Sequence, residues 1–83
     1  MSLTEIPGWS IVEGKLHRSY KFPDFISALA FVNQIGAAAE ELGHHPNIAF
    51  TWGLVEITIF THSINGLSEA DYVLAAKINA LRS

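Results

Sequence analysis

The sequence contains no cysteine, which excludes disulfide bonds and thiolate metal sites. Only five residues are lysine or arginine, and the formal net charge is -3 with neutral histidines. A nucleic-acid backbone is bound through a clustered basic patch, so we expect no DNA or RNA partner. No apolar run reaches the roughly 18 residues of a membrane helix, and the first residues, MSLTEIPGW, lack the pattern of a secretory signal. We therefore expect a cytoplasmic protein with no membrane partner.

The length and composition predict one small domain over residues 1–83 that associates with itself. A chain of 83 residues buries only about 60% of its unfolded surface, which leaves a lone domain marginally stable. Hydrophobic residues make up 49% of the chain and charged residues 16%. Apolar surface that one domain cannot bury favours contact with a partner, and a second copy is the simplest partner.

The first half of the chain reads as a hairpin followed by a long helix. Strand patterns run from Trp9 to Val12 and over residues 16–22, with Glu13-Gly14 as the turn between them. After Pro23-Asp24 the apolar residues recur at steps of three and four, which predicts an amphipathic helix over residues 25–42. Gly43 is placed to end this helix.

The second half repeats this order. Residues 48–52 and 55–59 alternate as strands around a Trp52-Gly53 turn. The side chains on the outer face of the second strand alternate onward through Phe60 to His62. Ser68 and Asp71 have capping-box spacing before a closing helix over residues 72–81. The order ββαββα predicts an α+β fold, a four-stranded antiparallel sheet covered on one face by two helices. The open face and the sheet edges are then available for association.

Two adjacent histidines, His44 and His45, stand where the long helix meets the next strand. Pro46 forces an extended conformation there, so the helix cannot continue through the pair. The Trp52-Gly53 turn would bring the end of the following strand, with His62, back to the same rim of the sheet. Glu40 lies four residues before His44 and shares its helix face if the helix persists that far.

Three interpretations of this histidine cluster are open. The histidines could belong to a solvated turn. They could bind zinc with Glu40, although adjacent residues in an extended chain point in opposite directions, so His44 and His45 do not easily share one ion. They could also act as acid and base, because imidazole gains and loses a proton near neutral pH. Trp9 could lie in the core or form the wall of a flat site, and core is the default for such a tryptophan. His17 has the outward parity of a surface residue.

The chain resembles the pterin-4a-carbinolamine dehydratases over residues 8–80. Its "THSINGLSEAD" is similar to a segment of that family, and "GW" with "LHRSYKF" matches its first hairpin. The family signature is satisfied at each spacing by these residues: Glu40, His44, His45, Pro46, Trp52, His62 and Asp71. The chain departs from many members at Ala70, where they carry arginine.

The resemblance implies an enzyme that dehydrates 4a-hydroxytetrahydropterin to quinonoid dihydropterin in tetrahydropterin recycling, without metal or other cofactor. It implies that His44 and His62 are acid–base groups and that His45 assists. Substrate-binding roles fall to Glu40, Pro46 and Trp9, and supporting roles fall to Asp71 and Trp52. It also implies a homodimer or homotetramer that pairs sheets edge to edge and packs long helices together, using Ala28, Ala37, Ala38 and Ala39. The alternative is a non-catalytic protein-interaction or assembly-factor module of the same fold.

Overall fold

The computed structural model describes residues 2–81 and begins with a short 3-10 helix, η1 (Leu3–Glu5), before the first hairpin. The hairpin consists of β1 (Ser10–Val12) and β2 (Lys15–Lys21) in antiparallel register. Glu13 and Gly14 both have positive φ, at 53° and 76°, as a tight two-residue hairpin turn requires. The predicted turn is confirmed. The first strand begins one residue later than expected, at Ser10, and the second both begins and ends one residue earlier, at Lys15 and Lys21.

Helix α1 (Phe25–Leu42) has the predicted bounds. The Asp24 side chain accepts a hydrogen bond from the Ser27 backbone N–H at 2.8 Å, which satisfies one of the free donors of the first turn. Gly43 ends the helix in the left-handed region, with φ of 67°, a conformation that costs glycine little. A local signal therefore defines each end of this helix.

The second hairpin pairs β3 (Asn47–Phe50) with β4 (Leu54–Ile59), and the four strands lie in the order β1-β2-β4-β3. Trp52 belongs to the turn between β3 and β4 rather than to a strand. Beyond β4 the chain forms a 3-10 helix, η2 (His62–Ile64), closed by a bridge between Thr61 and Gly66. The prediction that strand alternation continues to His62 is therefore wrong. Helix α2 (Glu69–Leu81) completes the fold.

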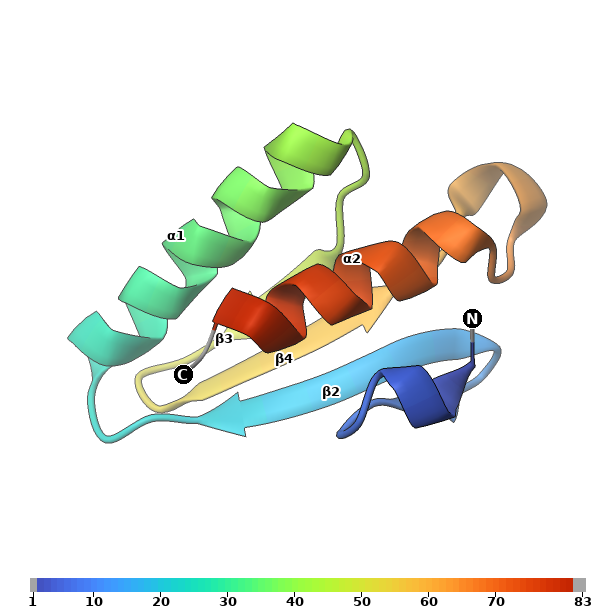
Figure 1. Cartoon of the computed structure of the whole chain (residues 1–83). Coiled ribbons are helices and arrows are strands. Elements are labelled where there is room, and N and C mark those ends of the chain that lie inside the picture. The colour runs from blue at the N-terminus through green and yellow to red at the C-terminus, as the bar shows by residue number, and fades with distance from the viewer. Residues whose placement is uncertain (1, 82–83) are drawn as a thin grey trace.

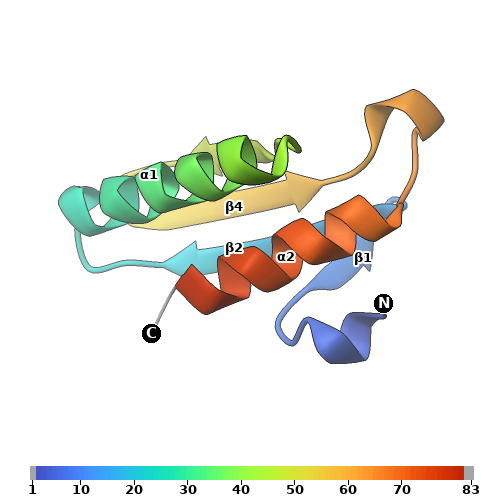
Figure 2. The same ribbon diagram turned by 45° about the horizontal axis from the view of Figure 1, so that its top comes forward.

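Helices α1 and α2 lie side by side over one face of the sheet (Figures 1 and 2). Alternate residues of the two central strands face the helices, and their apolar members are buried. The core combines this face with one side of each helix and with the N-terminal segment: Ile6, Trp9, Leu16, Tyr20, Ala28, Phe31, Ile35, Val55, Ile57, Ile59, Leu74, Ala75 and Ile78. The α+β prediction is confirmed. Within residues 2–81 no helix combines the length and apolar character needed to cross a membrane.

Candidate active site

The turn after α1 fixes the two adjacent histidines. The N–H groups of Gly43 and His44 both bond to the Ala39 carbonyl, which closes the last helical turn. The left-handed backbone of Gly43 then turns the chain away from the helix axis, and Pro46 prevents a return to helical geometry. His44 and His45 consequently lie on a four-residue link between two regular elements, where their backbone has little freedom.

His44 contacts a carboxylate that is shielded from solvent. Its Nε2 lies 2.5 Å from Asp71 Oδ1, and the Asp71 side chain has no exposed area. The other carboxylate oxygen accepts from Thr61 Oγ1 at 2.9 Å and from the Ser68 backbone N–H at 2.7 Å. A buried carboxylate is tolerated when hydrogen bonds replace its lost water. Asp71 therefore holds together the α1–β3 link, the end of β4 and the start of α2.

The bond to Asp71 determines which nitrogen of His44 carries the proton. A carboxylate can only accept hydrogen bonds, so the donor is the Nε2–H group of His44. In neutral His44 the other ring nitrogen, Nδ1, is then unprotonated and can take up a proton. The side chain of His44 is 20% exposed, which leaves part of the ring accessible to a small molecule.

His45 forms a second imidazole–carboxylate pair on the opposite side of the link. Its Nε2 lies 2.5 Å from Glu40 Oε2, on the last turn of α1. Both side chains are largely exposed, so the pair adds little to stability. The two adjacent imidazoles thus contact carboxylates of different helices, α2 for His44 and α1 for His45. Glu40 therefore contacts His45 rather than His44, with which it was expected to share a helix face.

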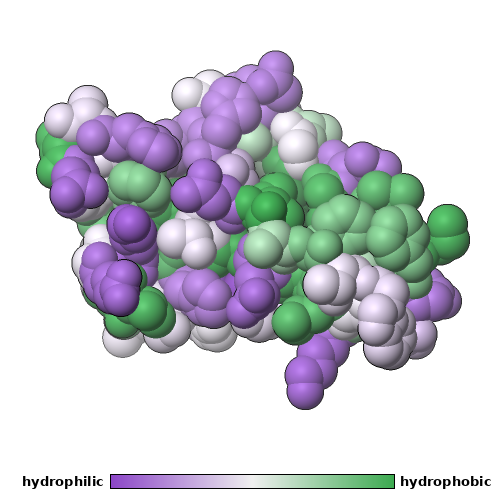
Figure 3. Space-filling model, turned by 180° about the vertical axis from the view of Figure 1, so that it is seen from behind, coloured by the Kyte–Doolittle hydropathy of each residue, from purple (hydrophilic) through white to green (hydrophobic). Residues whose placement is uncertain are grey.

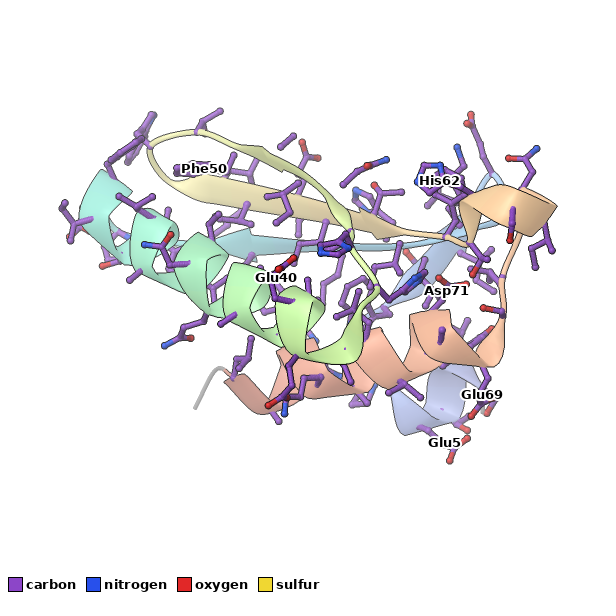
Figure 4. All side chains as sticks on the ribbon, turned by 90° about the horizontal axis from the view of Figure 1, so that it is seen from above. Glu5, Glu40, Phe50, His62, Glu69 and Asp71 are labelled. Atoms are coloured by element: carbon purple, nitrogen blue, oxygen red, sulfur yellow. The ribbon has the colours of Figure 1, made fainter. Side chains whose placement is uncertain are left out.

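His62 reaches the same end of the sheet from the other strand of the hairpin. Asn47 pairs with Thr58, so the residues before β3 and those after β4 are neighbours. The residue before His62, Thr61, bonds to Asp71. The His62 ring itself is exposed and stacks on Phe60, with the ring centroids 4.2 Å apart. Figure 4 shows His62 and Asp71 at this end, Glu40 on α1, and Phe50 toward the opposite end of the hairpin.

The two tryptophans do not join this cluster. Trp9 is 6% exposed, and its Nε1–H donates to Asn79 Oδ1 at 2.8 Å, so the structure supports the core alternative rather than the wall of a flat site. Trp52 lies at the β3–β4 turn, at the opposite end of the hairpin from His44 and His62. Within this chain Trp52 does not lie beside the histidines, because strand register separates them by the length of β4, and its supporting role stays a prediction. Pro46 is half-buried next to His45.

The residues around Asp71 were only partly predictable. The spacing of Ser68 and Asp71 signals the helix cap, and the Asp71 side chain does reach back to the Ser68 N–H. Thr61 and Phe60 carry no comparable signal, because their contacts depend on how η2 folds back. Within residues 2–81 no three His, Asp or Glu side chains are placed to hold one metal ion. Activity without a metal stays a prediction.

The fold and this end of the sheet define an α+β protein with paired imidazoles and carboxylates at a strand–helix rim. The family model for pterin 4 alpha carbinolamine dehydratase matches residues 1–81. The chain therefore belongs to the pterin-4a-carbinolamine dehydratase family, and the resemblance seen in the sequence is confirmed.

Individual relatives and solved structures agree with this assignment. A Rubrobacter xylanophilus protein carries the provisional name pterin-4-alpha-carbinolamine dehydratase. It is 54% identical over 93% of this chain and 73% of its own length. A Rickettsia canadensis protein of the same name is 51% identical over 87% and 67%. A structure described as a transcriptional coactivator/pterin dehydratase from Brucella melitensis has a TM-score of 0.91 and 38% identity, covering 98% of this chain and 88% of that one.

A second solved structure carries a different description. It is a pterin dehydratase-like protein identified as a RuBisCO assembly factor in the alpha-carboxysome. Its TM-score is 0.75 with 29% identity, and the match covers 93% of this chain and 92% of that one. The description of this second structure thus gives an assembly role to a protein of the same fold.

Proposed function

We propose that this protein dehydrates 4a-hydroxytetrahydropterin to quinonoid dihydropterin by histidine acid–base catalysis, as a step of tetrahydropterin recycling. The observation that carries the proposal is the bond between His44 and the buried Asp71 carboxylate, at 2.5 Å. A histidine that is oriented by a carboxylate and still partly open to solvent is suited to proton transfer. Membership of the dehydratase family supports pterin as the substrate class.

The reaction needs one proton donor and one proton acceptor. The substrate loses its 4a-hydroxyl as water when an imidazolium protonates the hydroxyl oxygen and the N5 lone pair forms a double bond to C4a. A base then takes the ring N–H proton, so the net change is the loss of one water molecule. Two histidines can carry out the two transfers and exchange roles in the next turnover. Such positioned groups typically accelerate a step by about 100-fold to 10,000-fold.

We assign the two transfers to His44 and His62, with His45 assisting in binding and proton transfer. Glu40 would accept hydrogen bonds from pterin N–H groups. Its side chain and that of its partner His45 are both largely exposed, so the carboxylate is accessible to a ligand. Pro46 would pack against the flat ring. Asp71 positions His44 and need not touch the substrate.

The test is turnover of 4a-hydroxytetrahydropterin by single variants. His44→Ala and His62→Ala should each lower the enzymatic rate at least about 100-fold, after subtraction of the spontaneous reaction. His17→Ala is the matched control, because His17 lies on β2 and its side chain makes a long ion-pair contact to Glu56, at 3.9 Å. Near-normal turnover in both active-site variants would overturn the proposal, provided circular dichroism shows intact folds.

A protein-interaction or assembly role is the second candidate. The description of the RuBisCO assembly factor that shares this fold favours it. Such a role needs a surface rather than proton transfer, so loss of His44 or His62 would leave it intact. Absence of dehydratase activity in the unaltered protein would favour this candidate.

A further inference from the structure

Phe60 forms the centre of a contact cluster that includes Lys15 and His62. Its ring stacks on His62 with the centroids 4.2 Å apart and the planes tilted by 40°. The Lys15 ammonium lies 4.4 Å from the centroid of the same ring. The cluster joins neighbouring strands, because Leu16 of β2 pairs with Ile59 of β4. A cation over an aromatic face is attracted by the ring quadrupole, which makes that face partially negative, and this contact helps to fix the ring in place.

The imidazole of His62 depends on this ring for its orientation. The Thr61 side chain before it bonds to Asp71, and the backbone beyond it forms the η2 turn. Within residues 2–81, however, no hydrogen bond or ion pair holds the His62 ring. An exposed side chain without such a contact samples several rotamers, whereas a stacked ring is confined. Phe60 thus supplies for His62 the restraint that Asp71 supplies for His44.

We propose that Phe60 is a positioning residue for His62, holding its imidazole in the orientation used for proton transfer, with Lys15 bracing the Phe60 ring. The inference rests on the proposed function, since it assigns a role in the same reaction. Proton transfer falls off steeply when the acid or base is misplaced. Loss of the ring should therefore reduce kcat. KM should change little, because the pterin is still held by residues on the other side of the site.

The main experiment compares Phe60→Leu with Phe60→Tyr in the dehydratase assay. Phe60→Leu keeps an apolar side chain but removes the ring, and it should lower kcat about 10-fold with KM unchanged within about twofold. Phe60→Tyr keeps the stack and should restore kcat. Phe50→Leu is the matched control, because it removes a ring that stacks on Phe25 with centroids 5.3 Å apart and lies toward the opposite end of the hairpin (Figure 4).

A spectroscopic readout separates positioning from general loss of stability. The ring protons of His62 should show an upfield ring-current shift in the NMR spectrum of the unaltered protein. This shift should disappear in Phe60→Leu and persist in Phe60→Tyr and Phe50→Leu. Phe60→Met, whose longer and more flexible side chain can follow the shape of the same space, provides a second ring-free variant if Phe60→Leu does not fold.

The outcomes distinguish this inference from the proposed function. A His62→Ala variant with strongly reduced turnover, alongside ring-free Phe60 variants with normal kcat, would overturn the positioning role alone. Normal turnover in His44→Ala and His62→Ala would overturn both. A reduced kcat in Phe50→Leu equal to that in Phe60→Leu would also contradict the inference, since the effect would then come from general destabilisation.

Discussion

Asp71 is the side chain on which most of the site's geometry depends. It has no exposed area, yet it accepts hydrogen bonds from a histidine, a hydroxyl group and a backbone N–H on three different segments. If the carboxylate lost one acceptor oxygen, either His44 or both Thr61 and the Ser68 N–H would lose their bond to this residue. The same residue therefore contributes to the stability of the fold and to the orientation of His44.

Replacing Asp71 with asparagine should reduce both the stability of the fold and the precision with which His44 is oriented. The Asp71→Asn amide has nearly the same shape, but one of its two acceptors becomes a donor that faces another donor. A buried unsatisfied group costs about 1–3 kcal/mol, so urea unfolding should show a loss of that size. Dehydratase turnover should fall by about 10-fold to 100-fold, because His44 loses its partner or its correct tautomer. Unchanged stability together with unchanged turnover would show that the carboxylate is not required.

Backbone conformation at Gly8 gives a second prediction at the residue scale. Gly8 has φ of +92°, and a Cβ there would lie 2.5 Å from Arg18 Cζ. Arg18 cannot easily move away, because its Nη1 donates to Pro7 O at 2.8 Å and to Asn79 Oδ1 at 2.7 Å. Gly8→Ala should therefore destabilise the protein by about 1–3 kcal/mol in urea unfolding.

Gly36 provides the matched control for that measurement. It lies within α1, and a Cβ there would meet nothing within 4 Å. Gly36→Ala should stabilise the protein by about 0.4–1 kcal/mol, because alanine loses less backbone entropy on folding. If both variants shifted stability in the same direction, the strain argument at Gly8 would be wrong.

At the scale of elements, the segments with local signals are those that the sequence predicts well. The bounds of α1 follow from two local features. The Asp24 side chain caps the first turn, and the left-handed backbone of Gly43 ends the last one. The contacts of Thr61 and Phe60 could not be predicted, because they depend on the η2 turn, and alternation had suggested a continued strand. Trp52 lies at the predicted turn, and strand register places this turn at the opposite end of the hairpin from the histidines.

The cap of α1 predicts a specific pH dependence. The Ser27 backbone N–H bonds to the Asp24 carboxylate and lowers the pKa of that group below its ordinary value of 3.8. Since the folded-state pKa is below the unfolded one, the ionised carboxylate stabilises the fold above the unfolded pKa. This stabilisation is lost as the pH falls through the folded pKa.

Asp24→Asn isolates this contribution, because asparagine is also a good cap but carries no charge. The unaltered protein should be more stable than Asp24→Asn at about pH 7, and the difference should shrink toward about pH 3. Urea unfolding of both proteins across that range measures it. A difference that grew on acidification would contradict the sign of the lowered pKa.

At the scale of the whole molecule, apolar side chains remain exposed after the core is complete. Ile26 is 72% exposed and Trp52 is 70% exposed, with Phe25 also half open. Figure 3 shows hydrophobic side chains gathered at the end of the molecule where α1 begins and β3 turns into β4. Soluble monomers seldom leave large continuous apolar patches uncovered, so this end is a candidate contact surface.

The helices offer a second surface, although fewer of the predicted alanines contribute to it than expected. Ala28 and Ala39 are buried in the chain's own interior and cannot contact another copy. Ala37 is exposed, and it lines a hollow of about 400 Å³ between α1 and α2 together with Ala80 and Leu81. Small side chains at such a hollow allow a helix of another copy to approach closely.

These surfaces predict that the protein associates with itself. In the part of the chain that the structure describes, the edge strands β1 and β3 each have one side without a strand partner, and β1 also exposes Ile11 and Val12. An edge with free backbone groups and apolar side chains favours pairing with a second chain. We expect at least a dimer at micromolar concentration, and a tetramer if the helix surface is also used. Sedimentation equilibrium measures this directly. A single 9.1 kDa species at tens of micromolar would contradict the prediction. The exposed apolar side chains of β1 and α1 would then face water in a stable monomer.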